Sequence, residues 1–230
     1  MKLTFLGTAG DLQSCLQGRR QSGGMMVTFR DEQIHVDPGP GSMVNMVNYK
    51  LLPSKTSTVV LSSNQLLHIN DVYLTCATGK VETVYLPTSV REKIRTNDLS
   101  GASIDSAANT VQLRNCRVTT EFNGVSSQVF IETPHTRILY CSEGLPYCQD
   151  EVDIFIVSVG ARGVPKDHLV DVLRTINAKI TVLNRCASGI HHDDFMVLAR
   201  DAQRELDRDV IAAHDGMVLK PEGAHTYYSY

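Results

Sequence analysis

Two histidines and one glutamate of this sequence have side chains that could support hydrolytic chemistry. His68, Glu143 and His214 each follow an apolar run of the chain. Two imidazoles and a carboxylate form one of the ligand sets of catalytic zinc, which keeps a further position open for water. One hypothesis is therefore a site in which a single zinc or other divalent metal is bound by these three residues. His68 is equally explained as a residue at a helix start with a satisfied hydrogen bond.

A denser group of metal-binding residue types occupies residues 189–194, with the sequence GIHHDD. It stands directly before a stretch with helical periodicity, residues 193–206, where Asp193 or Asp194 fits the helix N-cap or pairs with the helix dipole. Adjacent side chains cannot all face one ion. We therefore expect a helix start here and not a metal site.

A third group of residues could bind an anion. Arg185 carries a permanent positive charge and only donates hydrogen bonds. Residues 37–42, with the sequence DPGPGS, predict a rigid, tight loop that brings backbone close to a cavity, although a purely structural turn explains the same pattern. The residues that we expect to contact a small anionic ligand are Asp37, Gly39, Arg185 and Asp215.

The secondary-structure pattern that must position these residues differs between the two parts of the chain. Strands dominate the first half, and strand–helix alternation follows residue 152. The expected strands are residues 2–6, 24–29, 33–36, 58–61, 83–86, 103–104, 110–113, 117–121, 127–132, 137–140, 153–159, 178–183 and 210–213, and the expected helices are residues 165–176 and 193–206, with a helical pattern also ending at Gly79. This order is typical of an α/β fold in which two sheets pack face to face with helices outside.

Composition limits the classes of protein to which the chain can belong. Its 230 residues, 42% of them hydrophobic, can bury one large core, so we expect a single domain over residues 1–230. A net charge of −3 gives no support for bulk nucleic-acid or membrane binding. Six cysteines without a Cys-X-X-Cys pair argue against a zinc ribbon and fit reduced thiols. The apolar run at the start ends at Gly7, too short for a signal peptide, and we expect a cytoplasmic protein.

Motifs along nearly the whole chain share one family resemblance. They are FLGTAG at residues 5–10, VDPGPGS at 36–42, a strand leading to Ser62 with HIND at 68–71, and IAAHDGM at 211–217. Together they resemble the metallo-β-lactamase superfamily, in its tRNase Z and phosphodiesterase-like branch of metal-dependent hydrolases. The resemblance implies a four-layer αββα sandwich of two mixed β-sheets flanked by helices.

The resemblance also assigns seven metal-ligand positions to this sequence. They fall on Ser63, Gln65, Leu67, His68, Asn123, Glu143 and Arg185. One ligand is kept, at His68, one is replaced conservatively, at Glu143, and five are lost. Serine, glutamine and asparagine are weak ligands, leucine cannot coordinate, and arginine presents only donors and a positive charge. The resemblance with these substitutions implies a degenerate, non-catalytic member, a pseudoenzyme without a metal cofactor.

Arg185 also indicates what could replace a metal ion. A guanidinium at a ligand position would repel a dication, and it could form an ion pair with Glu143. Our hypothesis is that these two side chains pair and fill the former metal cavity.

Three functions remain open. The first is a binding protein for a small anionic or nucleotide-like ligand, held by Arg185 and backbone donors of residues 37–42. The second is an interaction or assembly protein, with a homodimer among its expected partners. The third, implied by the resemblance, is an active hydrolase of phosphodiester or other ester bonds with a single metal at His68, Glu143 and His214. The likeness in fold favours the third, and the residues favour the first two.

Overall fold

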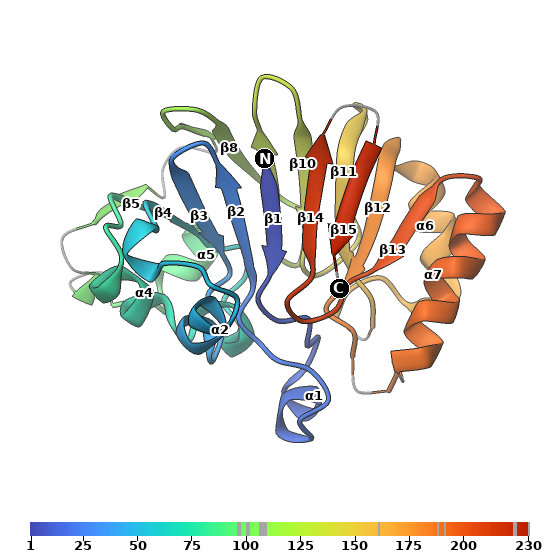
Figure 1. Cartoon of the computed structure of the whole chain (residues 1–230), viewed down its shortest axis with the longest axis horizontal. Helices are drawn as coiled ribbons and strands as arrows, with labels where there is room; N and C mark the ends of the chain where they lie inside the picture. Colours follow the sequence, from blue (N-terminus) through green and yellow to red (C-terminus); the bar gives the residue numbers. More distant parts are fainter. Residues whose placement is uncertain are drawn as a thin grey trace.

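Two β-sheets form the centre of the computed structural model, which describes residues 1–95, 98–99, 102–105, 110–160, 162–187, 189–190, 192–222 and 225–229 (Figure 1). The strands of the first sheet are β1 (Lys2–Phe5), β2 (Met25–Phe29), β3 (Glu32–Val36), β4 (Thr58–Val60), β5 (Thr83–Tyr85), β6 (Ser103–Asp105), β14 (Val218–Glu222) and β15 (His225–Ser229). The strands of the second are β7 (Thr110–Gln112), β8 (Arg117–Phe122), β9 (Ser127–Glu132), β10 (Arg137–Cys141), β11 (Val152–Ser158), β12 (Ala178–Asn184) and β13 (Asp209–Ala212).

Both sheets are mixed. The first has the strand order β15-β14-β1-β2-β3-β4-β5-β6, and the second has the order β13-β12-β11-β10-β9-β8-β7. The runs β3 to β6 and β10 to β13 are parallel, and the other pairs are antiparallel. The carboxyl ends of the parallel strands are the usual place for a ligand site in sheets of this kind.

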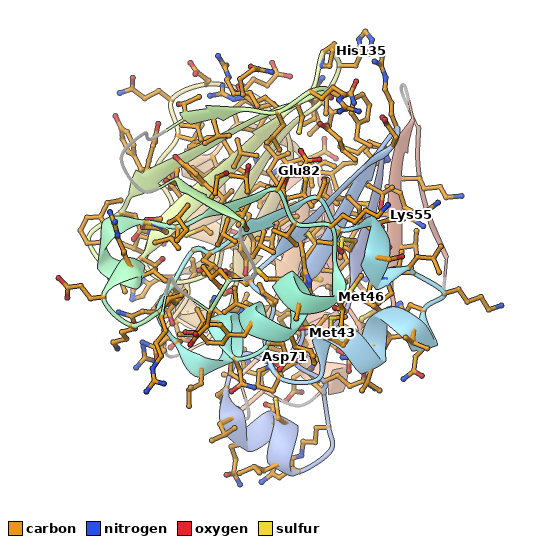
Figure 2. The ribbon with its side chains drawn as sticks, turned by 90° about the vertical axis from the view of Figure 1, so that its left-hand side faces the viewer. Met43, Met46, Lys55, Asp71, Glu82 and His135 are labelled. Carbon is orange, nitrogen blue, oxygen red and sulfur yellow. The ribbon has the colours of Figure 1, made fainter. Side chains whose placement is uncertain are left out.

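Helices cover the outer face of each sheet, except that α1 (Leu12–Leu16) projects beyond the ends of the strands (Figure 1). The others are α2 (Ser42–Asn48), α3 (Leu66–Ile69), α4 (Val72–Thr78), α5 (Thr88–Arg91), α6 (Leu169–Thr175) and α7 (His192–Leu206), with short 3₁₀ turns η1 (Pro53–Lys55) and η3 (Lys166–His168). Helices α6 and α7 bury Leu173 and Phe195 on the second sheet. Helices α2 and α4 lie over the first sheet, where Met46 of α2 packs against its strands and Met43 contacts Thr75 of α4 (Figure 2).

The layer between the sheets is the largest apolar core. Phe5 of the first sheet and Ile138 and Ile156 of the second are each fully buried in it. Alternate residues of the antiparallel strands point into this layer, as the period of two along a strand requires. The predicted four-layer αββα sandwich is confirmed. Within the described part of the chain, no helix is long and apolar enough to cross a membrane.

Some elements were not expected from the sequence. Helices α1 and α2 and strands β14 and β15 had no clear pattern, and the helical pattern that ends at Gly79 divides into α3 and α4. In α2 the residues Val44 and Val47 are exposed although Met46 is buried, so apolar side chains occupy more than one face and hide the helical period. The helix starts after Gly41, whose φ of 82° is left-handed and suits a glycine.

Buried His35 on β3 makes the fold sensitive to acid. Its Nε2 lies 2.9 Å from the Gly23 carbonyl oxygen, and burial lowers its pKa from 6.5 to about 4. Below pH 6.5 the unfolded chain therefore binds a proton at His35, whereas the folded chain does not until the pH nears 4. The contribution of His35 to the free energy of unfolding is thus complete above pH 6.5 and is lost as the pH falls toward 4. We expect a loss of about 2.5 kcal/mol from this residue between pH 7 and pH 4.5.

Urea denaturation of the wild type and of His35→Gln at these two pH values tests this expectation. The glutamine can still donate to Gly23 but does not titrate, so the variant should lose about 2.5 kcal/mol less than the wild type on acidification. Equal losses in both proteins would contradict it.

Candidate functional site

A small polar cavity of about 20 Å³ lies where β10, β11 and β12 end. Its lining consists of Gly10, His68, Ser142, Glu143, Ser158, Val159, Gly160, Arg162, Gly163, Arg185 and Ala187. Such a volume holds about one water-sized group. Three of the seven expected ligand positions, His68, Glu143 and Arg185, therefore meet at one place.

Asp37 is the centre of a buried hydrogen-bond network beneath this cavity. The residue has no exposed surface. Its carboxylate accepts hydrogen bonds from Ser62 N at 2.7 Å, Ser62 Oγ at 2.6 Å and Tyr140 Oη at 2.9 Å, and it lies 2.8 Å from His68 Nδ1. Burial would raise the pKa of this carboxyl, but His68, then Arg185 and Ser62, hold it below its ordinary value. Asp37 is thus a carboxylate at neutral pH.

His68 connects the network to the cavity. Because the Asp37 carboxylate only accepts, Nδ1 of His68 carries the proton and Nε2 of the neutral ring is an acceptor. Burial, followed by the positive charge of Arg185, lowers the pKa of His68. The ring is therefore neutral at pH 7 and brings an acceptor to the cavity.

Glu143 has polar contacts at both carboxylate oxygens and at its backbone. Ser63 Oγ donates to Oε2 at 3.0 Å, and Nη1 of Arg162 lies 3.5 Å from Oε1. Asn123 Nδ2 and Ser126 Oγ donate to the Glu143 carbonyl oxygen at 2.7 and 3.1 Å. Arg162 itself is 60% exposed, so it stands at the mouth of the cavity.

Arg185 is buried, with 4% of the residue exposed. Within the described part of the chain, its guanidinium has no hydrogen bond or ion pair. Burying a cation without a partner lowers the stability of the fold. The backbone of Arg185 also has a φ of 50°, a conformation that arginine rarely adopts. Ser158 Oγ, also in the lining, is buried and lacks a hydrogen-bond partner among the described residues. Two polar groups of the cavity are thus available to a ligand.

The loop after β1 fixes the backbone at Arg185. Cys186 N donates to the Thr8 carbonyl oxygen at 3.0 Å, and Gly10 N donates to the Cys186 carbonyl oxygen at 2.9 Å. A Cβ at Gly10 would overlap the Arg185 carbonyl group, so only glycine permits this close approach. The loop after β1 therefore fixes the backbone from which the Arg185 side chain extends.

The predicted ion pair between Glu143 and Arg185 does not form among the described residues. Among the described residues, the guanidinium that pairs with Glu143 belongs to Arg162. Arg185 approaches from the end of β12, whereas Arg162 comes from the loop after β11. Sequence analysis missed Arg162, Ser142 and Ser158, although Arg162 stands in the glycine-containing stretch GARG at residues 160–163, directly after an apolar strand.

The single-metal site proposed for His68, Glu143 and His214 is not assembled. His214 lines a different groove, beside α7 and β13, and its Nδ1 lies 3.1 Å from the Asp215 carbonyl oxygen. In the described ranges, no three residues among His, Cys, Asp and Glu gather closely enough to hold a metal ion. A catalytic zinc site needs about three protein ligands. The donor set at the cavity therefore does not fit the metal centre implied by the family resemblance.

The other residues expected to contact a ligand, Asp37, Gly39 and Asp215, lie outside the cavity lining. Asp37 is enclosed by its own network, and Gly39 packs against the Leu67 backbone, so neither residue lines the cavity, and ligand contact by either stays a prediction. Asp215 accepts from Thr8 N at 2.8 Å, Thr8 Oγ1 at 2.7 Å and Gln21 N at 2.6 Å, which braces the loop after β1.

Gln65 and Leu67, two of the expected ligand positions, also lie outside the lining. Gln65 precedes α3 and its Nε2 donates to Oδ1 of the neighbouring Asn64 at 3.4 Å, while Leu67 is buried. In the segment of residues 189–194, α7 begins at His192, as expected for a helix start, and His191 lies outside the described residues.

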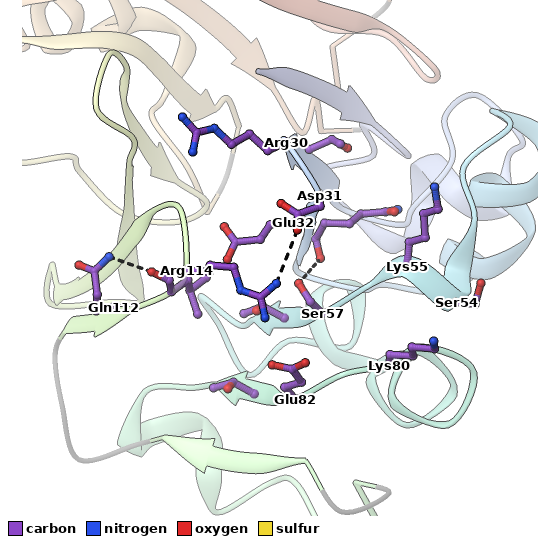
Figure 3. Close-up of a pocket in the computed structure, with 15 residues that line it drawn as sticks. Arg30, Asp31, Glu32, Ser54, Lys55, Ser57, Lys80, Glu82, Gln112 and Arg114 are labelled. Carbon is purple, nitrogen blue, oxygen red and sulfur yellow. Dashed lines mark hydrogen bonds and ion pairs between the residues drawn. The ribbon is translucent and has the colours of Figure 1, made fainter.

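A wider groove of about 550 Å³ lies at the opposite ends of the strands, where β4 and β5 begin (Figure 3). Its charged side chains have both signs, and the ion pair among them joins Arg114 and Asp31. Arg114 reaches Asp31 at 3.6 Å, and both are largely exposed. Exposed ion pairs of this kind contribute little to the stability of the fold, and they do not indicate a ligand site. The small cavity is therefore the better candidate for the functional site.

Comparison with known sequences gives limited information. No protein-family model matches the sequence. A segment of 71 residues is 28% identical to an uncharacterized protein of Methanocaldococcus jannaschii, MJ1374. The match covers 31% of this chain and only 27% of the length of that relative.

Solved structures share the fold over nearly the whole chain. The metallo-β-lactamase fold protein YhfI from Bacillus subtilis superposes with a TM-score of 0.74 at 15% identity, covering 94% of this chain and 97% of YhfI. The short form of human tRNase Z gives 0.70 at 16% identity, covering 96% and 100%. A diphosphatase from the PhnP family gives 0.71 at 14% identity, covering 96% and 98%. The chain has the metallo-β-lactamase fold.

Proposed function

We propose that this protein of the metallo-β-lactamase fold is a binding protein for a small anionic ligand and does not operate a dinuclear metal centre. The observation that carries the proposal is the buried guanidinium of Arg185, which lines the cavity without a hydrogen bond or ion pair to another described residue. An anionic oxygen would supply the partner that such a buried cation requires.

The other cavity groups favour an anion that also carries a proton. Arg185 only donates, but neutral His68 presents an acceptor at Nε2, and Ser158 Oγ can donate or accept. A singly protonated phosphoryl group offers both acceptor oxygens and an O–H donor, and it is about half populated near pH 6. A sulfate dianion offers acceptors alone. The ligand class proposed is therefore a phosphate or phosphomonoester with one oxygen inside the cavity, since an O–H there can donate to His68 Nε2 and accept from Arg185.

The competing function is a metal-dependent hydrolase. Its support is the shared fold, and one of the similar structures is a diphosphatase. The donor set at the cavity does not fit such a metal centre, as described above, and Arg185 repels a dication at that position.

Thermal unfolding at pH 6 with phosphate, sulfate or chloride at matched ionic strength tests the binding function. Phosphate is expected to raise the melting temperature, because a ligand at 100 times its Kd adds about 2.7 kcal/mol to the free energy of unfolding. For a chain of this size that corresponds to about 5–10 °C. Sulfate should raise it less.

Two arginine variants and a metal assay make the test specific. Arg162→Gln at the cavity mouth should weaken the phosphate effect, whereas Arg114→Gln in the opposite groove is the matched control and should leave it unchanged. Stoichiometric zinc in protein purified without chelator, together with turnover of a phosphodiester substrate, would replace the proposal with the hydrolase.

A further inference from the structure

Three exposed apolar side chains stand at the turn between β8 and β9 and on the loop facing it. Phe122 is 68% exposed, Val125 is 61% exposed and Leu145 is 58% exposed. We call these three residues the apolar rim. Single exposed apolar residues need no explanation, but a group of them on adjoining segments marks a binding surface.

The apolar rim adjoins the cavity through backbone contacts. Gly144, which precedes Leu145, directly follows the cavity residue Glu143, and a Cβ on it would lie 3.2 Å from Val125 Cβ. Gly144 N also donates to the Arg162 carbonyl oxygen at 2.8 Å, so the loop of the rim touches the residue at the cavity mouth.

Phe122 is linked through Ser127 to the hydrogen-bond network beneath the cavity. It pairs in register with Ser127, whose N donates to the Ser62 carbonyl oxygen at 2.9 Å. Ser62 is the residue that binds the Asp37 carboxylate beneath His68. The turn is tied to the cavity at a second point, since Asn123 Nδ2 donates to the Glu143 carbonyl oxygen at 2.7 Å.

We propose that the apolar rim binds an apolar or aromatic substituent of the same ligand whose anionic group enters the cavity. The ligand is then a phosphomonoester with an apolar group next to its phosphate. This inference rests on the proposed function and adds the part of the ligand that the cavity cannot hold, because the cavity admits only about one water-sized group.

The chemistry around the rim favours a small molecule over a second protein chain. Arg162 places a 60% exposed guanidinium at the cavity, and its carbonyl oxygen accepts from Gly144 N next to Leu145 of the rim, so an anion and an apolar group can be recognised by neighbouring residues. A stable protein interface needs about 20–30 residues on each side, far more than the three of the rim.

Calorimetric titration of the full chain with inorganic phosphate and with phenyl phosphate, at pH 6, tests the inference. The wild type should bind phenyl phosphate about tenfold more tightly than phosphate, because the phenyl ring is removed from water. Phe122→Ser and Val125→Ser should reduce that preference toward about onefold and leave phosphate binding unchanged. Val47→Ser is the matched control, since Val47 is 64% exposed on α2, which packs on the other sheet.

The outcomes separate the inference from the function on which it rests. Equal affinity of the wild type for phosphate and phenyl phosphate would overturn the role of the rim and leave anion binding intact. Absence of binding by both ligands would overturn the proposed function itself. A concentration-dependent dimer in the wild type that Phe122→Ser abolishes, without any preference for phenyl phosphate, would show the rim to be a self-association surface and would also overturn the inference.

Discussion

Replacing Asp37 with alanine is expected to lower the free energy of unfolding by about 3–5 kcal/mol, because each buried donor that loses its acceptor costs about 1–3 kcal/mol. The carboxylate is fully buried, and its loss leaves His68 Nδ1, Tyr140 Oη and the Ser62 amide without their shared acceptor. Its φ of 54° adds to the cost, because alanine tolerates the left-handed region less well than aspartate or asparagine. Urea denaturation at pH 7 measures the change.

Two further variants separate charge, backbone and burial at this position. Asp37→Asn keeps the size and tolerates the same φ, so its remaining loss reports the negative charge and its hydrogen bonds. Asp31→Ala removes an exposed carboxylate paired with Arg114 at 3.6 Å, and we expect a change within about 1 kcal/mol. A loss from Asp37→Ala no larger than that of Asp31→Ala would contradict the buried network.

Arg185→Met should abolish the stabilisation by phosphate and, without ligand, should raise the free energy of unfolding by about 1–4 kcal/mol. Methionine fills a similar volume without a charge to bury. An arginine with a structural ion pair would give the opposite sign, since its loss would destabilise the fold. Thermal unfolding with and without phosphate measures both effects in one series.

The titration of His68 gives an independent readout for the same variant. After burial, Arg185 is the next cause of the lowered pKa of this histidine, so the pKa should rise in Arg185→Met. NMR titration of the imidazole follows it directly. A variant that is less stable, still responds to phosphate and shows an unchanged pKa of His68 would refute the role given to Arg185.

Local patterns predicted the regular elements where those patterns were strong. The apolar runs that became β9, β11 and β12 lie within one residue of their observed bounds at both ends. Short helices such as α1 and α2 were not predicted, because five to seven residues span at most two turns, which is too few for a helical period to be recognised.

The sequence by itself determined the two-sheet sandwich and which side chain stands at each of the seven expected ligand positions. Strand and helix periodicity acts over neighbouring residues, and the chemistry of a ligand position depends on which side chain stands there, so both can be read without coordinates. Only the tertiary structure decided that Glu143 pairs with Arg162, that His214 lies in another groove, and that Arg185 is buried beside a small cavity. Such contacts join residues far apart along the chain, as between Asp37 and Tyr140, which are separated by 103 positions. Their geometry is set by how the two sheets and their loops pack, for which no local pattern provides a signal.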